Sequence, residues 1–342
     1  MKLSDFDYHL PPELIAQTPA EPRDKSRLMV IHRDTVTMEH RTFHELTEYI
    51  QGGDTIVFNN SRVIPARLFG RKENSNANVE LLLLRRLDNN IWETLARPGK
   101  RIGVGAKISI TGKTDDTNIS ITAEVIELGK GGIRVVNFSD ESLLEQLGNV
   151  PLPPYIHEPL SDPERYQTVY SKVKGSVAAP TAGLHFTPRL LDELQRKDIQ
   201  FAFVTLHIGL DTFRPVQVDN PTLHQIHTEY GVLSPETAEL ISKTKEQGRR
   251  VIAVGTSTIR LIEAAAQTGT VQPFSGNVDL FILPGHKFRT TDAVITNFHL
   301  PRSTLLMLIS AFAGRDFVLQ AYKQAKDHGY RFYSFGDAML IF

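Results

Sequence analysis

The stretch from Ser176 to Leu191, SVAAPTAGLHFTPRLL, places a histidine directly ahead of a predicted helix start. Thr187 is a favourable N-cap residue and Pro188 is favoured in the first helical turn, so we expect the chain to turn near His185 and enter a helix. Backbone N–H groups at a helix start lack partners within the helix and can bind an anion or a polar ligand. The stretch is therefore a candidate ligand site. A tight turn packed with small residues is the alternative interpretation.

A second histidine, His207, ends a predicted strand in FVTLHIGLDTFRPV, and Gly209, Asp211 and Arg214 follow it. Imidazole titrates near neutrality and a partly buried carboxylate can be tuned upward, so this arrangement suits general acid–base chemistry. Buried histidines are often structural, however. A core histidine hydrogen-bonded to a backbone carbonyl remains the alternative for both His185 and His207.

Two further segments run from an apolar strand through a polar turn into a helix. They are RVIAVGTSTIRLIEAAA and VITNFHLPRSTLLMLISAFAG. Ligands of open α/β sheets bind beyond the carboxyl ends of the strands, where such turns lie. The residues expected to contact a ligand there are Gly255, Thr256 and Thr258 in the first segment, and Asn297, His299 and Ser303 in the second. Helix capping alone is the alternative for the first segment, and a surface turn for His299.

The segment HQIHTEY carries His224, His227 and Glu229. These residue types bind zinc, but the segment lacks the H-E-x-x-H spacing and an obvious further ligand. Substrate contact or structural hydrogen bonding is favoured over a metal, and no metal site is predicted.

Several function classes are disfavoured by what the sequence lacks. There is no Walker A loop and no G-x-G-x-x-G between a strand and a helix, and neither Ser176 nor Ser257 has a nucleophile-elbow context. The sequence has no cysteine, which excludes disulfides, thiolate nucleophiles and cysteine-ligated metals. No stretch reaches the roughly 18 apolar residues of a membrane span, and the start lacks a basic segment followed by an apolar run. We expect a cytoplasmic protein without membrane contact.

The charge is nearly balanced overall, with a net charge of −1, but it is uneven along the chain. Between Arg62 and Lys113 there are eleven lysines and arginines against four acidic residues. Such an excess could follow a phosphate backbone. Lysines that protect exposed strand edges are the alternative of equal weight.

The elements that must position these residues indicate an α/β fold, a discontinuous layered domain with an inserted small β-barrel. Length alone favours two domains, since 342 residues exceed the usual size of a single core. Residues 61–149 contain short β-type runs separated by turn signals, which predicts the barrel. Residues 1–60 and 150–342 form the predicted α/β catalytic domain, in which strands and helices alternate, and the proline cluster VPLPPYIHEP marks the return to it.

Individual elements are predicted from periodicity and capping signals. Strands are expected at 28–32, 35–40, 55–58, 201–209, 250–256, 278–283, 292–298 and 338–342. Helices are expected at 43–53, 188–197, 235–248, 257–269, 303–314 and 317–329, with Ser234 as N-cap and Gly248 as stop of the third.

Long strings of the sequence together resemble one family, the S-adenosylmethionine:tRNA ribosyltransferase-isomerases of the queuosine pathway. The strings include NNSRVIPARL, ARPGKR, PLPPYI, ERYQTVY, GSVAAPTAGLHFT, VTLHIGLDTFRPV, HQIHTEY, VIAVGTSTIRLIE, TNFHLPRSTLLMLISAFAG and YRFYSFGDAMLIF. The similarity runs from DFDYHLPPELIAQTP to the last residue. Asp211 departs from the family pattern, which usually has a small residue there, so its role as a shared catalytic acid is in doubt. HEPLSDPERYQ also looks locally variant.

The resemblance implies transfer and isomerisation of the ribosyl part of S-adenosylmethionine onto 7-aminomethyl-7-deazaguanine at the tRNA wobble position. The products are epoxyqueuosine-tRNA, adenine and methionine. S-adenosylmethionine is consumed as a substrate, and no redox cofactor is implied. The expected partner is the anticodon stem-loop of tRNA, and the expected state is a monomer. Two alternatives stay open: a non-catalytic RNA-binding protein, and a His/carboxylate metalloenzyme at HQIHTE.

Residue roles follow from the resemblance as hypotheses. The base and acid are assigned to His185 and His207, with His227 and Glu229 in reserve. The expected S-adenosylmethionine contacts are Thr181, Gly183 and the two polar helix starts, and Arg214 and His224 are further substrate contacts. The expected anticodon contacts are Asn59, Asn60, Arg62 and Arg67.

Overall fold

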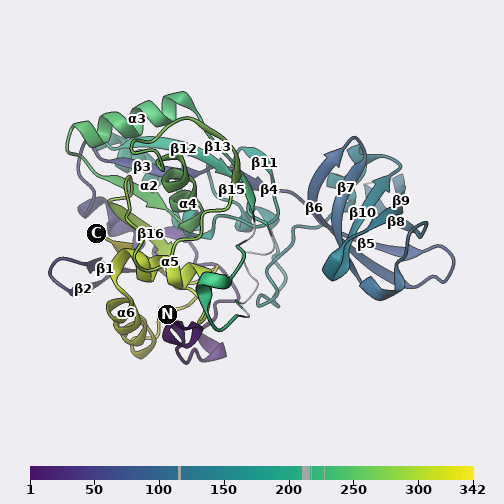
Figure 1. Ribbon diagram of the computed structural model, residues 1–342, viewed down its shortest axis with the longest axis horizontal. Helices are drawn as coiled ribbons and strands as arrows, with labels where there is room; N and C mark the ends of the chain where they lie inside the picture. The colour runs from purple at the N-terminus through teal and green to yellow at the C-terminus, as the bar shows by residue number, and fades with distance from the viewer. Residues whose placement is uncertain (115–116, 210–215, 217, 227) are drawn as a thin grey trace. The chain divides into compact units, whose positions relative to one another are not determined.

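The computed structural model describes residues 1–342 except 115–116, 210–215, 217 and 227. The chain divides into two compact units, drawn in Figure 1. Unit 1 comprises Met1–Arg62, Pro153–Val173 and Ala179–Phe342. Unit 2 comprises Val63–Leu152 and Lys174–Ala178. The α/β class and the inserted β-barrel predicted from the sequence are confirmed by the elements of these units.

Unit 1 is built on one large sheet. Among the described residues it has nine strands in the order β15-β13-β12-β3-β14-β16-β17-β1-β2. Their bounds are β1 (Arg27–His32), β2 (Thr37–Thr42), β3 (Thr55–Asn59), β12 (Gln200–Leu206), β13 (Glu229–Leu233), β14 (Val251–Val254), β15 (Phe274–Val278), β16 (Ala293–Asn297) and β17 (Ala338–Ile341).

The centre of this sheet is parallel. β3 pairs in parallel with β12 on one side and with β14 on the other, and β14 pairs in parallel with β16. Along the chain β3 comes first, then β12, β14 and β16, so the direction of strand addition reverses between β3 and β14. A reversal of this kind opens a crevice at the carboxyl ends of the strands, which is the usual ligand position in such sheets.

Both faces of the sheet are covered by helices. Alternate side chains of each strand point to opposite faces, so neighbouring residues of one strand join different cores. Val57 of β3 joins the core that contains α3, α4, α5 and α6, whereas Ile56 and Phe58 join the core that contains α2. The helices are α2 (Pro188–Arg196), α3 (Pro235–Glu246), α4 (Thr256–Ala265), α5 (Thr304–Ala313) and α6 (Arg315–Asp327). The result is a layered α/β unit with a rigid central sheet.

The helix starts agree with the capping signals in the sequence. Thr187 accepts a hydrogen bond from the N–H of Leu190, and Ser234 accepts one from the N–H of Thr237. Ser303 caps α5 in the same way. Each side-chain oxygen satisfies one of the N–H groups that a helix start leaves free, so the predicted caps at Thr187 and Ser234 are confirmed.

Unit 2 contains a closed barrel in the strand order β10-β7-β6-β5-β8-β9. Its strands are β5 (Arg67–Lys72), β6 (Asn78–Asp88), β7 (Ile91–Arg97), β8 (Lys107–Thr114), β9 (Thr117–Leu128) and β10 (Ile133–Phe138), and a short helix, α1 (Leu144–Leu147), follows. A separate pair of strands is formed by β4 (Ser61–Val63) and β11 (Val173–Ser176). Closure leaves the barrel without a free strand edge.

Among the segments that differ from the sequence-based predictions, three bear on unit 1. The helix expected at 43–53 is a 3-10 helix, Phe43–Glu48, which a capping box between Thr42 and Glu45 begins. The strand expected at 278–283 is wrong, because β15 ends at Val278. β13 is an additional strand. Its Gly231 lies so close to Leu261 that a Cβ atom would approach within 2.9 Å.

No single helix in the described part of the chain is long and apolar enough to cross a membrane. Only the consecutive helices α5 and α6 meet that criterion together, and the chain bends by 113° between them.

Candidate active site

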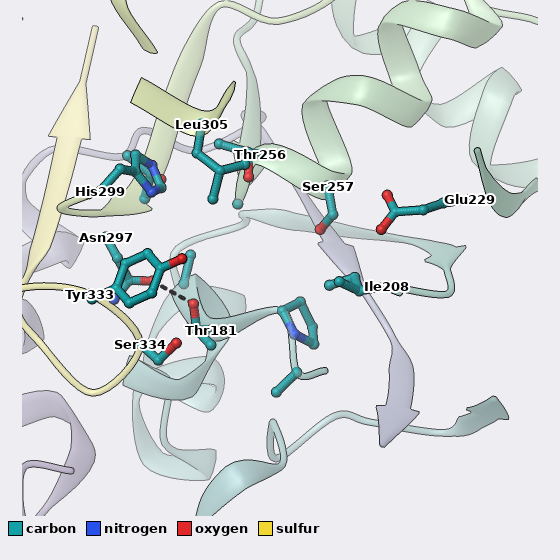
Figure 2. A pocket seen from close by; sticks show the side chains of 15 residues that line it. Thr181, Ile208, Glu229, Thr256, Ser257, Asn297, His299, Leu305, Tyr333 and Ser334 are labelled. Atoms are coloured by element: carbon teal, nitrogen blue, oxygen red, sulfur yellow. Dashed lines mark hydrogen bonds between the residues drawn. The ribbon is translucent and has the colours of Figure 1, made fainter. Parts of the chain in front are cut away.

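A pocket of about 570 Å³, partly open to solvent, lies at the carboxyl ends of the parallel strands of unit 1 (Figure 2). Its polar lining comes from five places: the start of α4, the end of β16 with the turn that follows it, the beginning of β13, the 3-10 helix Thr181–His185 and the segment before β17. The side chains with polar groups are Thr181, Glu229, Thr256, Ser257, Thr296, Asn297, His299, Tyr333 and Ser334.

Gly255 forms the turn between β14 and α4. Its φ of +86° is rarely adopted by residues with a Cβ atom, which explains glycine at this position. Its N–H donates to the carbonyl of Ile295 at 2.8 Å, which ties the turn to β16. The turn places Thr256 and Ser257 at the pocket, and Ser257 Oγ accepts a hydrogen bond from Asn59 Nδ2 at 3.2 Å.

Glu229 supplies a carboxylate to the pocket. β13 pairs antiparallel with β12, so its first residue lies at the carboxyl end of β12. Glu229 Oε2 lies 2.5 Å from Arg260 Nη1, and Oε1 accepts the N–H of Gly209 at 3.0 Å. Both charged side chains are buried, with exposed fractions of 5% and 7%. A buried carboxylate needs such partners, because an unpaired buried charge is strongly destabilising.

A chain of four hydrogen-bonded polar side chains crosses the wall opposite Glu229, and Figure 2 shows its first bond, between Thr181 and Asn297. Thr181 Oγ1 donates to Asn297 Oδ1 at 3.0 Å, and Asn297 Nδ2 donates to His185 Nε2 at 3.1 Å. Because Nε2 then accepts, the proton of neutral His185 lies on Nδ1 and is donated to Ser26 Oγ at 2.7 Å. His185 therefore fixes the orientation of the Asn297 amide that lines the pocket.

Two enclosed histidines are held neutral near this wall. Burial, with the positive charges of Arg331 and Arg23 as smaller contributions, lowers the pKa of His185 to about 3. Burial also lowers the pKa of His299 to about 3. His299 Nε2 lies 2.9 Å from Thr296 Oγ1, and both residues line the pocket. Both imidazoles act as neutral hydrogen-bonding groups near pH 7.

Tyr333 and Ser334 line the pocket although neither was singled out from the sequence. Tyr333 has a φ of +72°, which is uncommon for a bulky residue. Its ring packs edge-on against Tyr155 with centroids 4.1 Å apart, and Tyr155 Oη lies 2.5 Å from Ser334 Oγ. The polar turn in YSFGD, just before the last strand, was the signal that could have identified them.

The predicted site residues fall into separate groups. Those that line the pocket are Thr181, Glu229, Gly255, Thr256, Asn297 and His299. His185 lies behind the lining and contacts it through Asn297. Arg214 and His227, as well as Asp211, lie outside the described residues.

Other predicted residues do not line this pocket and make internal contacts. Asn59 is buried, with its amide bonded to Leu206 and Ser257. Thr258 Oγ1 donates to the carbonyl of Val254, and Ser303 caps α5. Gly183 packs against Tyr170 so closely that a Cβ atom would lie 1.9 Å from the phenol oxygen. These contacts hold the turns around the pocket in place, and the residues that make them do not line the pocket.

His207 is adjacent to pocket-lining Ile208 but does not itself line the pocket. Burial lowers the pKa of its half-buried imidazole. Among the described residues, no hydrogen-bond partner is found for its buried Nδ1. His207 therefore remains a prediction as a proton-transfer group.

The residues predicted to contact the anticodon are already engaged within the protein. Arg62 forms an ion pair with Glu164 and donates to Ser171 Oγ at 3.0 Å. Asn60 Oδ1 accepts a hydrogen bond from Thr205. In unit 2, Arg67 lies 3.3 Å from Glu80 and donates to the carbonyl of Leu152.

The segment HQIHTEY gives no metal centre in the described part of the chain. His224 packs edge-on against Phe281, and Glu229 is paired with Arg260. No group of three histidine or carboxylate side chains that could hold a metal ion is found among the described residues.

Comparison with known proteins gives matches over the whole length. Residues 3–341 match the family described as "Queuosine biosynthesis protein". The chain is 56% identical to the S-adenosylmethionine:tRNA ribosyltransferase-isomerase of Dehalococcoides mccartyi (strain CBDB1) and 53% identical to that of Desulfitobacterium hafniense, with 100% of both chains covered in each case. It is also similar to the crystal structure of S-adenosylmethionine tRNA ribosyltransferase from Thermotoga maritima. There the TM-score is 0.58 at 42% identity, covering 99% of this chain and 100% of that one.

Proposed function

Because the chain belongs to the queuosine biosynthesis protein family, we propose that it acts as an S-adenosylmethionine:tRNA ribosyltransferase-isomerase. The full-length match to relatives with this name carries the proposal. In the proposed reaction, the ribosyl part of S-adenosylmethionine moves onto 7-aminomethyl-7-deazaguanine at the wobble position of tRNA. Adenine and methionine leave, and epoxyqueuosine-tRNA is formed. The protein is proposed to work as a cytoplasmic monomer without membrane contact, with S-adenosylmethionine as a consumed substrate and no other cofactor.

The chemistry sets three requirements for the site. A base must remove a proton from the carbon beside the sulfonium, the tRNA amine must attack as a neutral group, and departing adenine must be protonated. A cationic sulfonium also favours a nearby carboxylate in a water-poor pocket. The pocket of unit 1 supports this assignment, because it combines one buried carboxylate with several neutral hydroxyl, amide and imidazole groups.

Glu229 is the preferred base, ahead of His185 and His207. Among the described residues assigned to catalysis, Glu229 is the one that lines the pocket. Arg260 and the N–H of Gly209 fix its carboxylate, so its orientation is set before the substrate arrives. His185 serves as a positioning residue for Asn297, because its Nδ1 is bonded to Ser26 and its Nε2 to the Asn297 amide, and His185 itself does not line the pocket.

The neutral wall is proposed to hold the ribose and adenine. Thr181 and Asn297 offer hydroxyl and amide groups, and Thr256 and Ser257 add hydroxyls at the start of α4. Sugar hydroxyls and base edges both donate and accept hydrogen bonds, which matches these side chains. The anticodon stem-loop remains the proposed partner of Arg62 and Arg67, which would exchange their carboxylates for phosphates on binding.

Adenine release tests the proposal directly. With S-adenosylmethionine present, the wild-type protein is expected to release adenine with tRNA that carries 7-aminomethyl-7-deazaguanine, and not with tRNA that carries guanine. Retained tRNA binding without adenine release would favour the non-catalytic alternative. Loss of activity with a chelator, restored by metal, would favour the metalloenzyme alternative.

Replacement of the base tests its assignment. Glu229→Gln is expected to lower kcat by at least about 100-fold, since a positioned general base contributes 10²–10⁴-fold. Binding of S-adenosylmethionine, measured by equilibrium dialysis, should be reduced far less. Glu229→Asp keeps a negative charge opposite Arg260, so this variant is less prone to misfold. Its shorter side chain withdraws the carboxylate from the pocket. Full turnover in both variants would remove Glu229 from the mechanism.

A further inference from the structure

A second pocket of about 680 Å³, partly open to solvent, lies within unit 2. Its walls combine apolar side chains, among them Leu83 and Leu144, with the indole of Trp92 and two pairs of opposite charges. None of its lining residues belongs to the pocket of unit 1. It is therefore separate from the site assigned to ribosyl transfer.

Trp92, in β7, is the single tryptophan of the sequence, and its indole is held in place by its polar edge. Nε1 donates to Glu141 Oε2 at 2.9 Å. Arg86 holds the same carboxylate through two hydrogen bonds, of 2.9 and 2.5 Å. Trp92 is half-buried, and no other aromatic ring among the described residues contacts it. The structure thus provides a fixed indole that has no aromatic stacking partner among the described residues.

The charges of this pocket restrict the chemistry of its ligand. Arg86 is paired with Glu141, and Lys174 Nζ lies 2.7 Å from Glu145, so the two cations are balanced by two carboxylates. A phosphate site would require an excess of positive charge. A flat, neutral ligand with a hydrogen-bonding edge fits these walls.

We propose that this pocket binds an unstacked base of the tRNA, other than the base that is modified, with the base stacked on Trp92. This inference rests on the proposed function for the identity of the RNA. Aromatic side chains bind single-stranded bases through their faces, largely independently of sequence. Glu141 has an unused acceptor position, and Lys174 has further N–H donors, so the edge of the base meets both kinds of partner.

Tryptophan fluorescence of the wild-type protein gives the first test, because all tryptophan emission comes from Trp92. Titration with full-length substrate tRNA, corrected for absorption by the RNA, is expected to quench this emission. The dissociation constant from quenching should equal that from filter binding. Unchanged emission at saturating tRNA would overturn the proposal. The measurement needs no turnover, so a protein that is quenched by tRNA and yet releases no adenine would refute the proposed function and leave this inference standing.

Three variants give the second test. Trp92→Leu should weaken tRNA binding about tenfold, in line with the loss of one stacked base, and leave the KM for S-adenosylmethionine unchanged. Trp92→Phe should recover most of the affinity, because it keeps an aromatic face. Phe69→Leu is the matched control, since Phe69 lies in the same barrel and is 54% exposed but does not line the pocket.

Affinity of Trp92→Leu within twofold of the wild type, or an equal loss in Phe69→Leu, would contradict the proposal. Circular dichroism melting identifies a variant that fails to fold. In that case the wild-type quenching experiment decides alone.

Discussion

His185 and His299 are both enclosed, and each has its imidazole hydrogen-bonded to a neutral polar side chain at the wall of the unit 1 pocket. Protonation of either ring would place a positive charge in a site without a carboxylate partner, which explains why burial lowers both pKa values to about 3. The wall opposite Glu229 therefore carries no charge near pH 7. It suits the sugar and base groups proposed to bind there, while the carboxylate of Glu229 is proposed to meet the sulfonium.

The enclosed histidines predict a loss of stability in acid. Each is neutral in the folded protein down to about pH 3, whereas in the unfolded chain it takes up a proton below its ordinary pKa of 6.5. The unfolded state therefore binds more protons between these values, and stability falls as the pH drops below 6.5. Each histidine contributes up to about 1.4 kcal/mol per pH unit.

Urea unfolding between pH 7 and pH 5 measures this effect. His185→Gln should show a dependence on pH that is shallower than the wild type by about 1 kcal/mol per pH unit. His9→Gln is the control for the substitution itself, because His9 is exposed. Equal dependence in His185→Gln and the wild type would show that His185 is not held neutral.

The sequence predicted several pocket residues because they follow parallel strands. Gly255, Thr256, Asn297 and His299 lie where the rule for carboxyl ends of strands placed them. The sequence could not show that His185 contacts the pocket only through Asn297, because that depends on packing between segments far apart in the chain. Tyr333 was missed for the same reason, since an aromatic residue in a short turn gives no periodic signal.

At the scale of elements, the turn after β14 joins the sheet to the pocket. Gly255 adopts a backbone conformation that residues with a Cβ atom rarely adopt, and it is hydrogen-bonded to β16. The next two residues, Thr256 and Ser257, take their positions from this turn. The geometry of the pocket is therefore set by the backbone between two strands as much as by the side chains.

Gly255→Ala is expected to destabilise the protein by about 1–3 kcal/mol, because a φ of +86° with a ψ of 155° is a backbone conformation that essentially only glycine adopts. It should also raise the KM for S-adenosylmethionine, because the turn relaxes. Gly248→Ala is the matched control. Gly248 also has a positive φ, of +67°, but open space surrounds it after α3. Gly248→Ala should lose stability and keep the wild-type KM for S-adenosylmethionine. If Gly255→Ala and Gly248→Ala had equal KM values for S-adenosylmethionine, the turn at Gly255 would have no role in substrate binding.

Capping and periodicity predicted most of the elements. Thr187 and Ser234 begin their helices as expected, because the cap is a local interaction. β13 was not predicted, since its five residues include Gly231 and gain their strand conformation from pairing with β12 and β15. The 3-10 helix Phe43–Glu48 has the apolar spacing of an α-helix, and the sequence does not distinguish the two.

At the scale of the whole molecule, the net charge of −1 gives no general attraction for tRNA. Affinity must then come from local groups. In the short 3-10 helix Gly99–Arg101 of unit 2, Lys100 and Arg101 are exposed, and neither forms an ion pair with a described residue. Unpaired cations of this kind bind phosphates without first giving up a carboxylate.

Neutralising both side chains, as Lys100→Gln with Arg101→Gln, should weaken tRNA binding. It should also reduce the slope of log affinity against log salt by about 0.7 for each phosphate that the variant no longer neutralises. Arg85→Gln is the control, because Arg85 is 69% exposed in the same unit but is paired with Glu93. Filter binding at several salt concentrations measures the slopes. A slope equal to that of the wild type would place the phosphate-binding residues elsewhere.

The position of β3 has a consequence for how the protein is made. This strand is buried throughout, and both of its sheet neighbours, β12 and β14, follow the entire barrel in the chain. A ribosome must therefore synthesise the barrel strands while β3 has no neighbour with which to pair. The barrel strands are contiguous and can fold during that interval. Until β12 emerges, an apolar strand with free hydrogen-bonding edges is open to chaperones and to other nascent chains.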